Sequence, residues 1–116
     1  TVYMDQLQIK KNGVTDVQVS NEIPNQYALS QNFPNPFNPS TMINYSIPNS
    51  SLVSIVIYDL LGREVKTLIN TEQNAGNYQV LWNGDNNYGS KVSSGTYFYS
   101  IRSSDFHQVR KMILLK

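Results

Sequence analysis

The sequence is poor in the residues that most chemistry depends on. It has no cysteine, one histidine, and only 15% charged residues among its 116. Without cysteine it can build neither a disulfide framework nor a thiolate metal site, although this says nothing about compartment. Nine basic residues against eight acidic ones leave a net charge of +1, so a polyanionic partner such as nucleic acid is not expected. No apolar run reaches the roughly 18 residues of a membrane-spanning helix, so no transmembrane segment is predicted.

The sequence also contains no grouping of side chains that is typical of a catalytic site. The single histidine, His107, falls on an alternating stretch near the carboxyl end, and no serine with a neighbouring base accompanies it. The carboxylates are scattered over predicted loops and turns, which favours solvated surface over a paired acid and base: Asp59, Glu64, Glu72, Asp85 and Asp105. We therefore predict a domain that is not an enzyme and needs no cofactor.

Residues 83–89, Asn-Gly-Asp-Asn-Asn-Tyr-Gly, space oxygen-bearing side chains as a calcium loop does. A dedicated calcium loop needs glycine at its sixth position and a bidentate glutamate at its twelfth. Here glycine comes seventh and Ser94 is twelfth, which leaves one formal charge in the loop. The pattern favours a plain connection between strands, and no metal is predicted.

What the sequence does contain, from Tyr27 onward, is short runs of period-two alternation separated by turn residues, with no helical periodicity. The predicted strands are residues 27–29, 42–47, 52–59, 64–69, 77–83, 96–102 and 108–115. About seven antiparallel strands in ninety residues are expected of an all-β, immunoglobulin-like sandwich.

Alternation also predicts the core and the turns. The side chains expected to face inward include Trp82, Tyr78, Val80, Ile55, Ile57 and Tyr45, with Trp82 at the centre and its indole N–H in need of one acceptor. Asp59, Gly62 and Gly95 are the predicted turn residues, since aspartate accepts backbone N–H bonds and glycine allows positive φ. Tyr97, Phe98 and Tyr99 place aromatics on both faces of one strand. Cross-strand packing is favoured for them over stacking on a sugar.

The first 26 residues differ from the rest. One strand is predicted within residues 1–13. It is either the last strand of a preceding, possibly jelly-roll, domain or an extra strand of this domain. Residues 14–26 are polar and typical of an extended linker, and residues 27–116 form the main domain. The start has neither an initiator methionine nor a signal peptide, so we expect a fragment from the carboxyl end of a longer protein.

Two segments dominate the functional interpretation. Residues 31–41, Gln-Asn-Phe-Pro-Asn-Pro-Phe-Asn-Pro-Ser-Thr, hold three prolines within six residues, which exclude helix and central strand and predict a stiff connector. The last eleven residues predict an amphipathic strand ending on a cation. A terminal strand at a sheet edge would offer unpaired backbone groups to a receptor strand.

Five segments together carry a family resemblance. They are residues 27–41, the run Ile-Tyr-Asp-Leu-Leu-Gly-Arg-Glu-Val at 57–65, residues 75–84, Ser-Gly-Thr-Tyr-Phe-Tyr at 94–99, and Arg-Lys-Met-Ile-Leu-Leu-Lys at 110–116. In this order they resemble the type A carboxyl-terminal sorting domain of the type IX secretion system. That family overlaps the immunoglobulin-like domain of the flagellar hook-capping protein. Asn83 departs from the aspartate more usual in the family, which leaves the turn intact.

The resemblance implies a non-catalytic address on a protein of a Bacteroidota-type bacterium, secreted or at the cell surface after passage through the periplasm. Its implied partners are the type IX outer-membrane translocon, a sortase-like peptidase that cuts in the linker, and the N-terminal cargo domain of the same polypeptide. On this model the translocon reads the basic terminal strand and the proline loop: Arg110, Lys111, Lys116, Phe33, Pro34 and Pro36. The alternative is a passive immunoglobulin-like accessory or carbohydrate-binding module of a secreted multidomain glycan-degrading enzyme.

Overall fold

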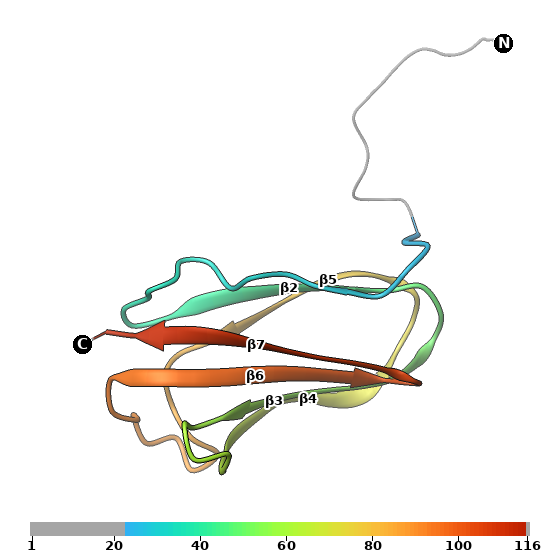
Figure 1. The fold of residues 1–116 in the computed structure, drawn as a ribbon. Coiled ribbons are helices and arrows are strands. Elements are labelled where there is room, and N and C mark those ends of the chain that lie inside the picture. The colour runs from blue at the N-terminus through green and yellow to red at the C-terminus, as the bar shows by residue number, and fades with distance from the viewer. Residues whose placement is uncertain (1–22, 116) are drawn as a thin grey trace, which may run out of the picture.

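The computed structural model describes residues 23–115 as two antiparallel sheets packed face to face (Figure 1). The seven strands are β1 (Ala28–Leu29), β2 (Thr41–Ile47), β3 (Ser51–Tyr58), β4 (Glu64–Gln73), β5 (Gly76–Trp82), β6 (Gly95–Ser103) and β7 (Phe106–Leu114). One sheet has the order β1-β2-β5 and the other β4-β3-β6-β7. The predicted all-β sandwich is confirmed.

Strand β4 departs from the prediction, because it continues to Gln73 rather than ending at residue 69. Its last residues are polar and lack alternation, so side-chain pattern could not reveal them. Backbone pairing decides the matter, since Gln73 lies opposite Ser51 in the register of β3. Irregularities in this pair after Ile55 and after Ile57 mark β-bulges that bend the hairpin.

The core lies between the two sheets and is built from alternate residues of each strand. Its buried side chains include Trp82, Ile55, Ile57 and Tyr45. Tyr78 and Val80 are only half-buried, although they pack against the same cluster. Strand β5 lies at the edge of its sheet, which leaves its inward side chains covered from fewer directions.

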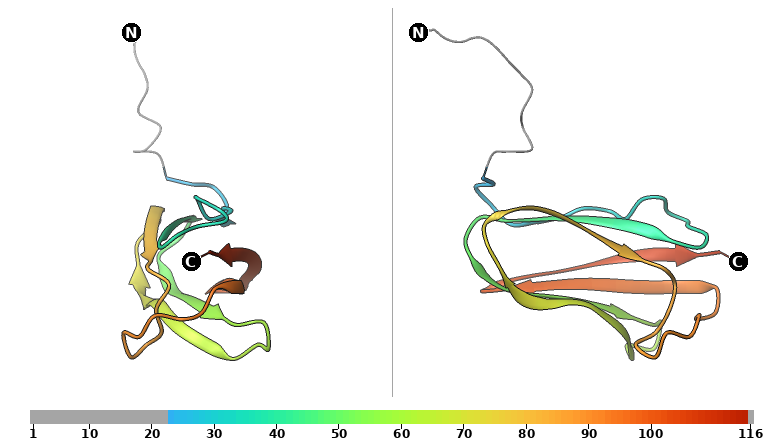
Figure 2. Two further views of the ribbon diagram at one scale, coloured as in Figure 1. Left: turned by 90° about the vertical axis from the view of Figure 1, so that its left-hand side faces the viewer. Right: turned by 180° about the vertical axis from the view of Figure 1, so that it is seen from behind.

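The two flanks of the sandwich are closed differently. Figure 2 shows the sandwich end-on, with β7, in red, on the flank opposite β4 and β5, in yellow to ochre. On the β7 flank the chain segment before β2 connects one sheet to the other. It forms a bridge from Phe33 to Met42 of β2 and then a parallel bridge from Phe37 to Leu114 of β7. This connector positions the site described below.

The described residues contain no helix that is long and apolar enough to span a membrane. Residues 23–26 form no strand. The strand predicted within residues 1–13 and the first part of the predicted linker lie outside the described residues.

Candidate functional site

The proline-rich connector lies along the outer edge of β7 and bonds to its backbone. Phe37 N–H donates to the Ile113 carbonyl at 3.0 Å, and Leu115 N–H donates to the Phe37 carbonyl at 2.8 Å. Between them, Ile113 N–H donates to Asn35 Oδ1 at 3.0 Å. Further along, Gln31 Nε2 donates to the Lys111 carbonyl at 2.8 Å. The connector therefore serves as a partner for the second half of the terminal strand.

The expectation that β7 offers an unpaired edge to a receptor strand is wrong for residues 111–115. Proline lacks an N–H, so a proline loop gives no sequence signal of strand pairing. The residues between the prolines keep their donors and acceptors, however, and Asn35 and Phe37 are the ones that reach β7. A segment that could not be a regular strand still covers a strand edge.

A buried polar network holds the connector in this shape. Asn32 is 2% exposed, and its Nδ2 donates to Thr41 Oγ1 at 2.9 Å and to the Pro34 carbonyl at 3.1 Å. Thr41 Oγ1 donates to the same Pro34 carbonyl at 2.8 Å. Since buried polar groups are costly when unpaired, this network favours one conformation of the loop.

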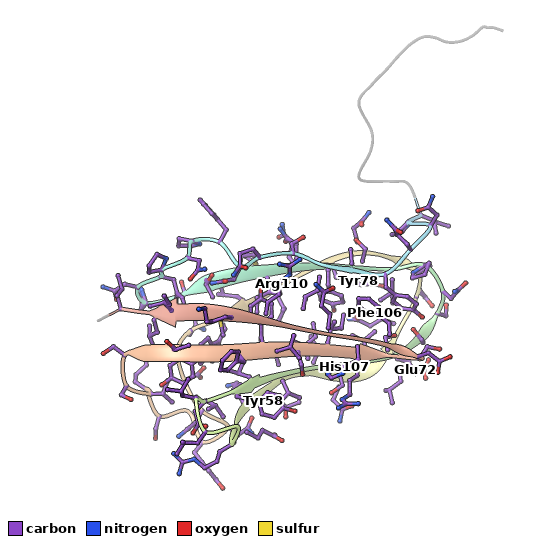
Figure 3. All side chains as sticks on the ribbon, in the orientation of Figure 1. Tyr58, Glu72, Tyr78, Phe106, His107 and Arg110 are labelled. Carbon is purple, nitrogen blue, oxygen red and sulfur yellow. The ribbon has the colours of Figure 1, made fainter. Side chains whose placement is uncertain are left out.

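Two side chains of the four-stranded sheet bond to the chain where it enters the connector, at residues 29–32. The Tyr99 hydroxyl, from β6, donates to the Ser30 carbonyl at 2.7 Å and accepts from Asn32 N–H at 2.8 Å. Arg110 Nε, from β7, donates to the Leu29 carbonyl at 2.6 Å, and Figure 3 labels its side chain on β7. Burial raises the pKa of the Tyr99 hydroxyl, against the lowering effects of the Asn32 N–H bond and the Arg110 charge.

The residues predicted to be read by a partner fall into different environments. Phe33 is 78% exposed, and Pro34, Pro36 and Lys111 are exposed as well. Arg110 is half-buried and donates to the Leu29 carbonyl of β1, just before the connector. Lys116 lies outside the described residues.

Sequence reasoning did not single out Asn32, Tyr99 or Phe37 as members of this site. Phe37 is 1% exposed and packs against Trp82, with ring centroids 5.6 Å apart, whereas Phe33 points to solvent. The two phenylalanines of one loop thus have opposite roles. The signal available in the sequence was weak, because both stand directly beside prolines.

The predicted turn at Asp59 is built by the aspartate itself. Asp59 Oδ1 accepts from the N–H groups of Leu61 and Arg63, each at 2.9 Å, and Oδ2 accepts from Arg63 Nε at 2.9 Å. The bond from the Arg63 backbone is the main cause that lowers the pKa of Asp59. Gly62 has φ of 84°, a left-handed conformation that glycine adopts without a steric penalty.

The loop at residues 83–89 uses its oxygen atoms within the protein. Asn86 Oδ1 accepts from the N–H groups of Tyr88 and Ser90, and Asn87 Oδ1 accepts from Thr67 N–H. The single carboxylate, Asp85, pairs with Lys66 at 3.1 Å. Within residues 23–115, no three or more histidine, aspartate or glutamate side chains gather as metal ligands would.

Comparison with known families identifies the domain. Residues 40–105 match the family model of the FlgD Ig-like domain. The chain belongs to this family. The match spans β2 to β6, and the domain is a small immunoglobulin-like module in which nothing points to a catalytic site.

Solved structures with this fold include two proteins of Porphyromonas gingivalis. Dimeric latent PorU has a TM-score of 0.59 and 24% identity, over 73% of this chain and 9% of that chain. PorZ, an essential bacterial surface component of the type IX secretion system, has a TM-score of 0.50 and 17% identity, over 84% of this chain and 12% of that chain. FlgD of P. aeruginosa has a TM-score of 0.51 and 24% identity, over 64% of this chain and 58% of that chain.

No curated protein matches the chain. The chain thus corresponds to a small part of PorU and PorZ and to a little over half of FlgD. At these identities the likeness concerns the fold.

Proposed function

We propose that this domain is a non-catalytic carboxyl-terminal sorting domain that directs a larger exported protein through the outer membrane by the type IX system. Its cargo is the domain that precedes it in the polypeptide, and residues 14–26 form the linker that a sortase-like peptidase would cut. The destination is the cell surface or the medium, reached through the periplasm. The fold shared with a domain of PorZ, itself a surface component of that system, supports this proposal.

The observation that carries the proposal is that the proline connector is hydrogen-bonded to the terminal strand. Four hydrogen bonds join residues 31–37 to residues 111–115, so the two most distinctive segments of the sequence form one surface. A passive spacer needs no such surface, whereas an address needs a fixed shape that a receptor can recognise.

The mode of recognition follows from the covered edge. Because the connector occupies β7 at residues 111–115, the receptor reads side chains rather than adding a strand there. Phe33, Pro34, Pro36 and Lys111 are exposed on this surface. Arg110 acts as a positioning residue through its bond to the Leu29 carbonyl, and Lys116 extends the positive charge.

The test is a secretion assay. The chain is fused to the carboxyl end of a periplasm-targeted reporter in a host with a type IX system, and the reporter is measured in the medium, at the surface and in the periplasm. Delivery outside the cell is expected. Retention in the periplasm of a folded fusion would reject the sorting function and leave the accessory or carbohydrate-binding module of a glycan-degrading enzyme.

A matched pair of variants tests the exposed phenylalanine. Phe33→Ser and Leu61→Ser each replace an exposed apolar side chain, at 78% and 77% exposure, so each should change stability by less than about 0.5 kcal/mol. Phe33→Ser should reduce secretion at least about tenfold, which corresponds to about 1.4 kcal/mol of lost recognition, and Leu61→Ser should not. Equal secretion of the two variants would remove Phe33 from the signal.

The basic end is tested by substituting Lys111 and Lys116 with glutamine, which keeps strand pairing and chain length. Arg102→Gln is the control, since Arg102 is an exposed cation on the neighbouring strand β6. Secretion should fall for the lysine double variant alone. Normal secretion of that variant would place recognition in the proline connector without the cations.

A further inference from the structure

Asn83 and Gly84, directly after β5, form the one asparagine–glycine pair within residues 23–115. The backbone nitrogen of the residue that follows an asparagine can attack the asparagine side chain, and glycine, which has no side chain, hinders this attack least. Proline has no N–H to lose, so Asn35 and Asn38, which each precede a proline, are excluded from the reaction. The pair at 83–84 is therefore the place where the described chain is most open to it.

Packing makes glycine necessary at position 84. Gly84 is buried and has φ of 71°, a conformation that residues with a side chain rarely adopt. A Cβ atom there would lie 3.3 Å from the Pro39 carbonyl oxygen and 3.4 Å from Leu114 Cδ2. The contacts that join this loop to the connector and to the terminal strand thus keep the residue after Asn83 free of a side chain.

Lys91 is placed to promote the attack. An antiparallel bridge pairs it with Asp85, and its Nζ donates to the Asn83 carbonyl at 2.9 Å. This carbonyl belongs to the peptide group whose N–H is that of Gly84. A cation at its oxygen stabilises the negative charge that spreads over the peptide group when the N–H loses its proton. The nearby carboxylate of Asp85 is paired with Lys66, which weakens its opposing effect.

Both reacting groups are free to react. Within residues 23–115, neither the Asn83 side chain nor the Gly84 N–H forms a hydrogen bond. Asn83 is exposed and lines a hollow of about 260 Å³ between the end of the connector and the loop that follows β5. Solvent water therefore has access to the reacting side chain.

We propose that Asn83 is a site of spontaneous deamidation, in which the Gly84 nitrogen is the nucleophile, Lys91 stabilises its charge and water is the co-reactant. The Gly84 nitrogen gives its proton to solvent and forms a bond to Asn83 Cγ, and the side-chain nitrogen takes a proton from solvent and leaves as ammonia. Water then opens the cyclic succinimide. Cleavage of the bond from nitrogen to Cγ gives aspartate, and cleavage of the bond from nitrogen to the main-chain carbonyl carbon gives isoaspartate.

The two products differ in their effect on the fold. Aspartate keeps the backbone as it is. Isoaspartate adds a methylene carbon to the main chain between the fully buried Trp82 and Gly84, whose carbonyl accepts from Val92 N–H at 2.9 Å. The isoaspartate form should therefore hold the loop less firmly against Leu114 and unfold at a lower urea concentration. The proposal is independent of the sorting function, because the reaction needs only this chain and water.

The experiment follows deamidation of the full 116-residue chain in mildly alkaline buffer by peptide mass spectrometry. Asn12, which also precedes a glycine, is the internal reference. Conversion of Asn83 should be detected in the native chain by the time that half of Asn12 has reacted. Lys91→Gln should slow the reaction at Asn83 about two- to fivefold, the size expected for a solvent-exposed charge, and should leave Asn12 unchanged.

Three controls show whether the hydrogen bond from Lys91 is the cause. Lys91→Arg keeps a cation and should retain most of the rate at Asn83. Arg102→Gln removes an exposed cation on β6 and should have no effect. In concentrated urea, where the bond from Lys91 is lost, the wild type and Lys91→Gln should react equally at Asn83.

Three outcomes would overturn the proposal. The first is a native wild-type chain in which Asn83 stays intact while Asn12 is fully converted. This arm needs no variant, so it decides the question even if Lys91→Gln fails to fold. The second is a folded Lys91→Gln chain that deamidates at Asn83 as fast as the wild type. The third is an equal slowing by Lys91→Gln in urea, since the effect would then come from the local sequence.

Discussion

The hydroxyl of Tyr99 accepts a hydrogen bond from the backbone N–H of Asn32 at 2.8 Å, although 67 positions separate the two residues. The same hydroxyl donates to the Ser30 carbonyl, so one side chain of the four-stranded sheet holds the entry to the proline connector. Asn32 in turn bonds to Thr41 and Pro34. The shape of the proposed recognition surface therefore depends on a residue within the core.

Tyr99→Phe should destabilise the fold by about 1–3 kcal/mol, because it leaves the buried Asn32 N–H and Ser30 carbonyl without their partner. Urea denaturation measures the change. Tyr58→Phe is the control, since Tyr58 lies half-exposed on β3 and its loss of a hydroxyl should cost less than about 0.5 kcal/mol. A similar cost for both variants would contradict the role given to Tyr99.

Trp82→Ala should destabilise the fold by about 3–5 kcal/mol, because the indole is fully buried and its removal leaves a cavity beside Phe37 and Tyr97. Trp82→Phe keeps an aromatic ring but removes the bond from Nε1 to the Asp85 carbonyl, and should cost less. A loss under about 1 kcal/mol for the alanine variant, measured in denaturant, would contradict the central position of Trp82.

Stability should decrease in alkaline solution. Burial raises the pKa of Tyr45 and of Tyr99, so the unfolded chain, with tyrosine near pH 10, loses these protons first. The stability that these two tyrosines contribute is thus complete below about pH 10 and is lost as the pH rises through their folded-state pKa values. Urea midpoints between pH 8 and 11 should fall, and more steeply for the wild type than for Tyr99→Phe. A midpoint independent of pH would contradict the raised pKa values.

Chelation with EDTA should leave the melting temperature nearly unchanged. The oxygen atoms of Asn86 and Asn87 already accept protein hydrogen bonds, and Asp85 is paired with Lys66. A large drop in melting temperature that calcium reverses would show that residues 83–89 bind the ion.

Much of the sandwich was accessible from local pattern, for a simple physical reason. Period-two alternation places every second residue on one face, so Ile55 and Ile57 could be assigned to the core before any pairing was known. Asp59 and Gly62 likewise build their turn from contacts within five residues. The end of β4 escaped this reasoning because its last residues are polar and are held by backbone pairing with β3.

The sequence by itself determined the all-β class and the turn built by Asp59 and Gly62, because each depends on the conformational preferences of neighbouring residues. Gly95, which was predicted in a turn, is instead the first residue of β6, where pairing with Leu114 extends the strand. Only the tertiary structure decided that the connector lies against β7 and that Phe37 is buried while Phe33 is exposed. It also decided that the connector bonds to the outer edge of the terminal strand, so that this edge is not open at residues 111–115. Those outcomes depend on hydrogen bonds between residues about 80 positions apart, and no local pattern encodes which distant backbone groups will meet.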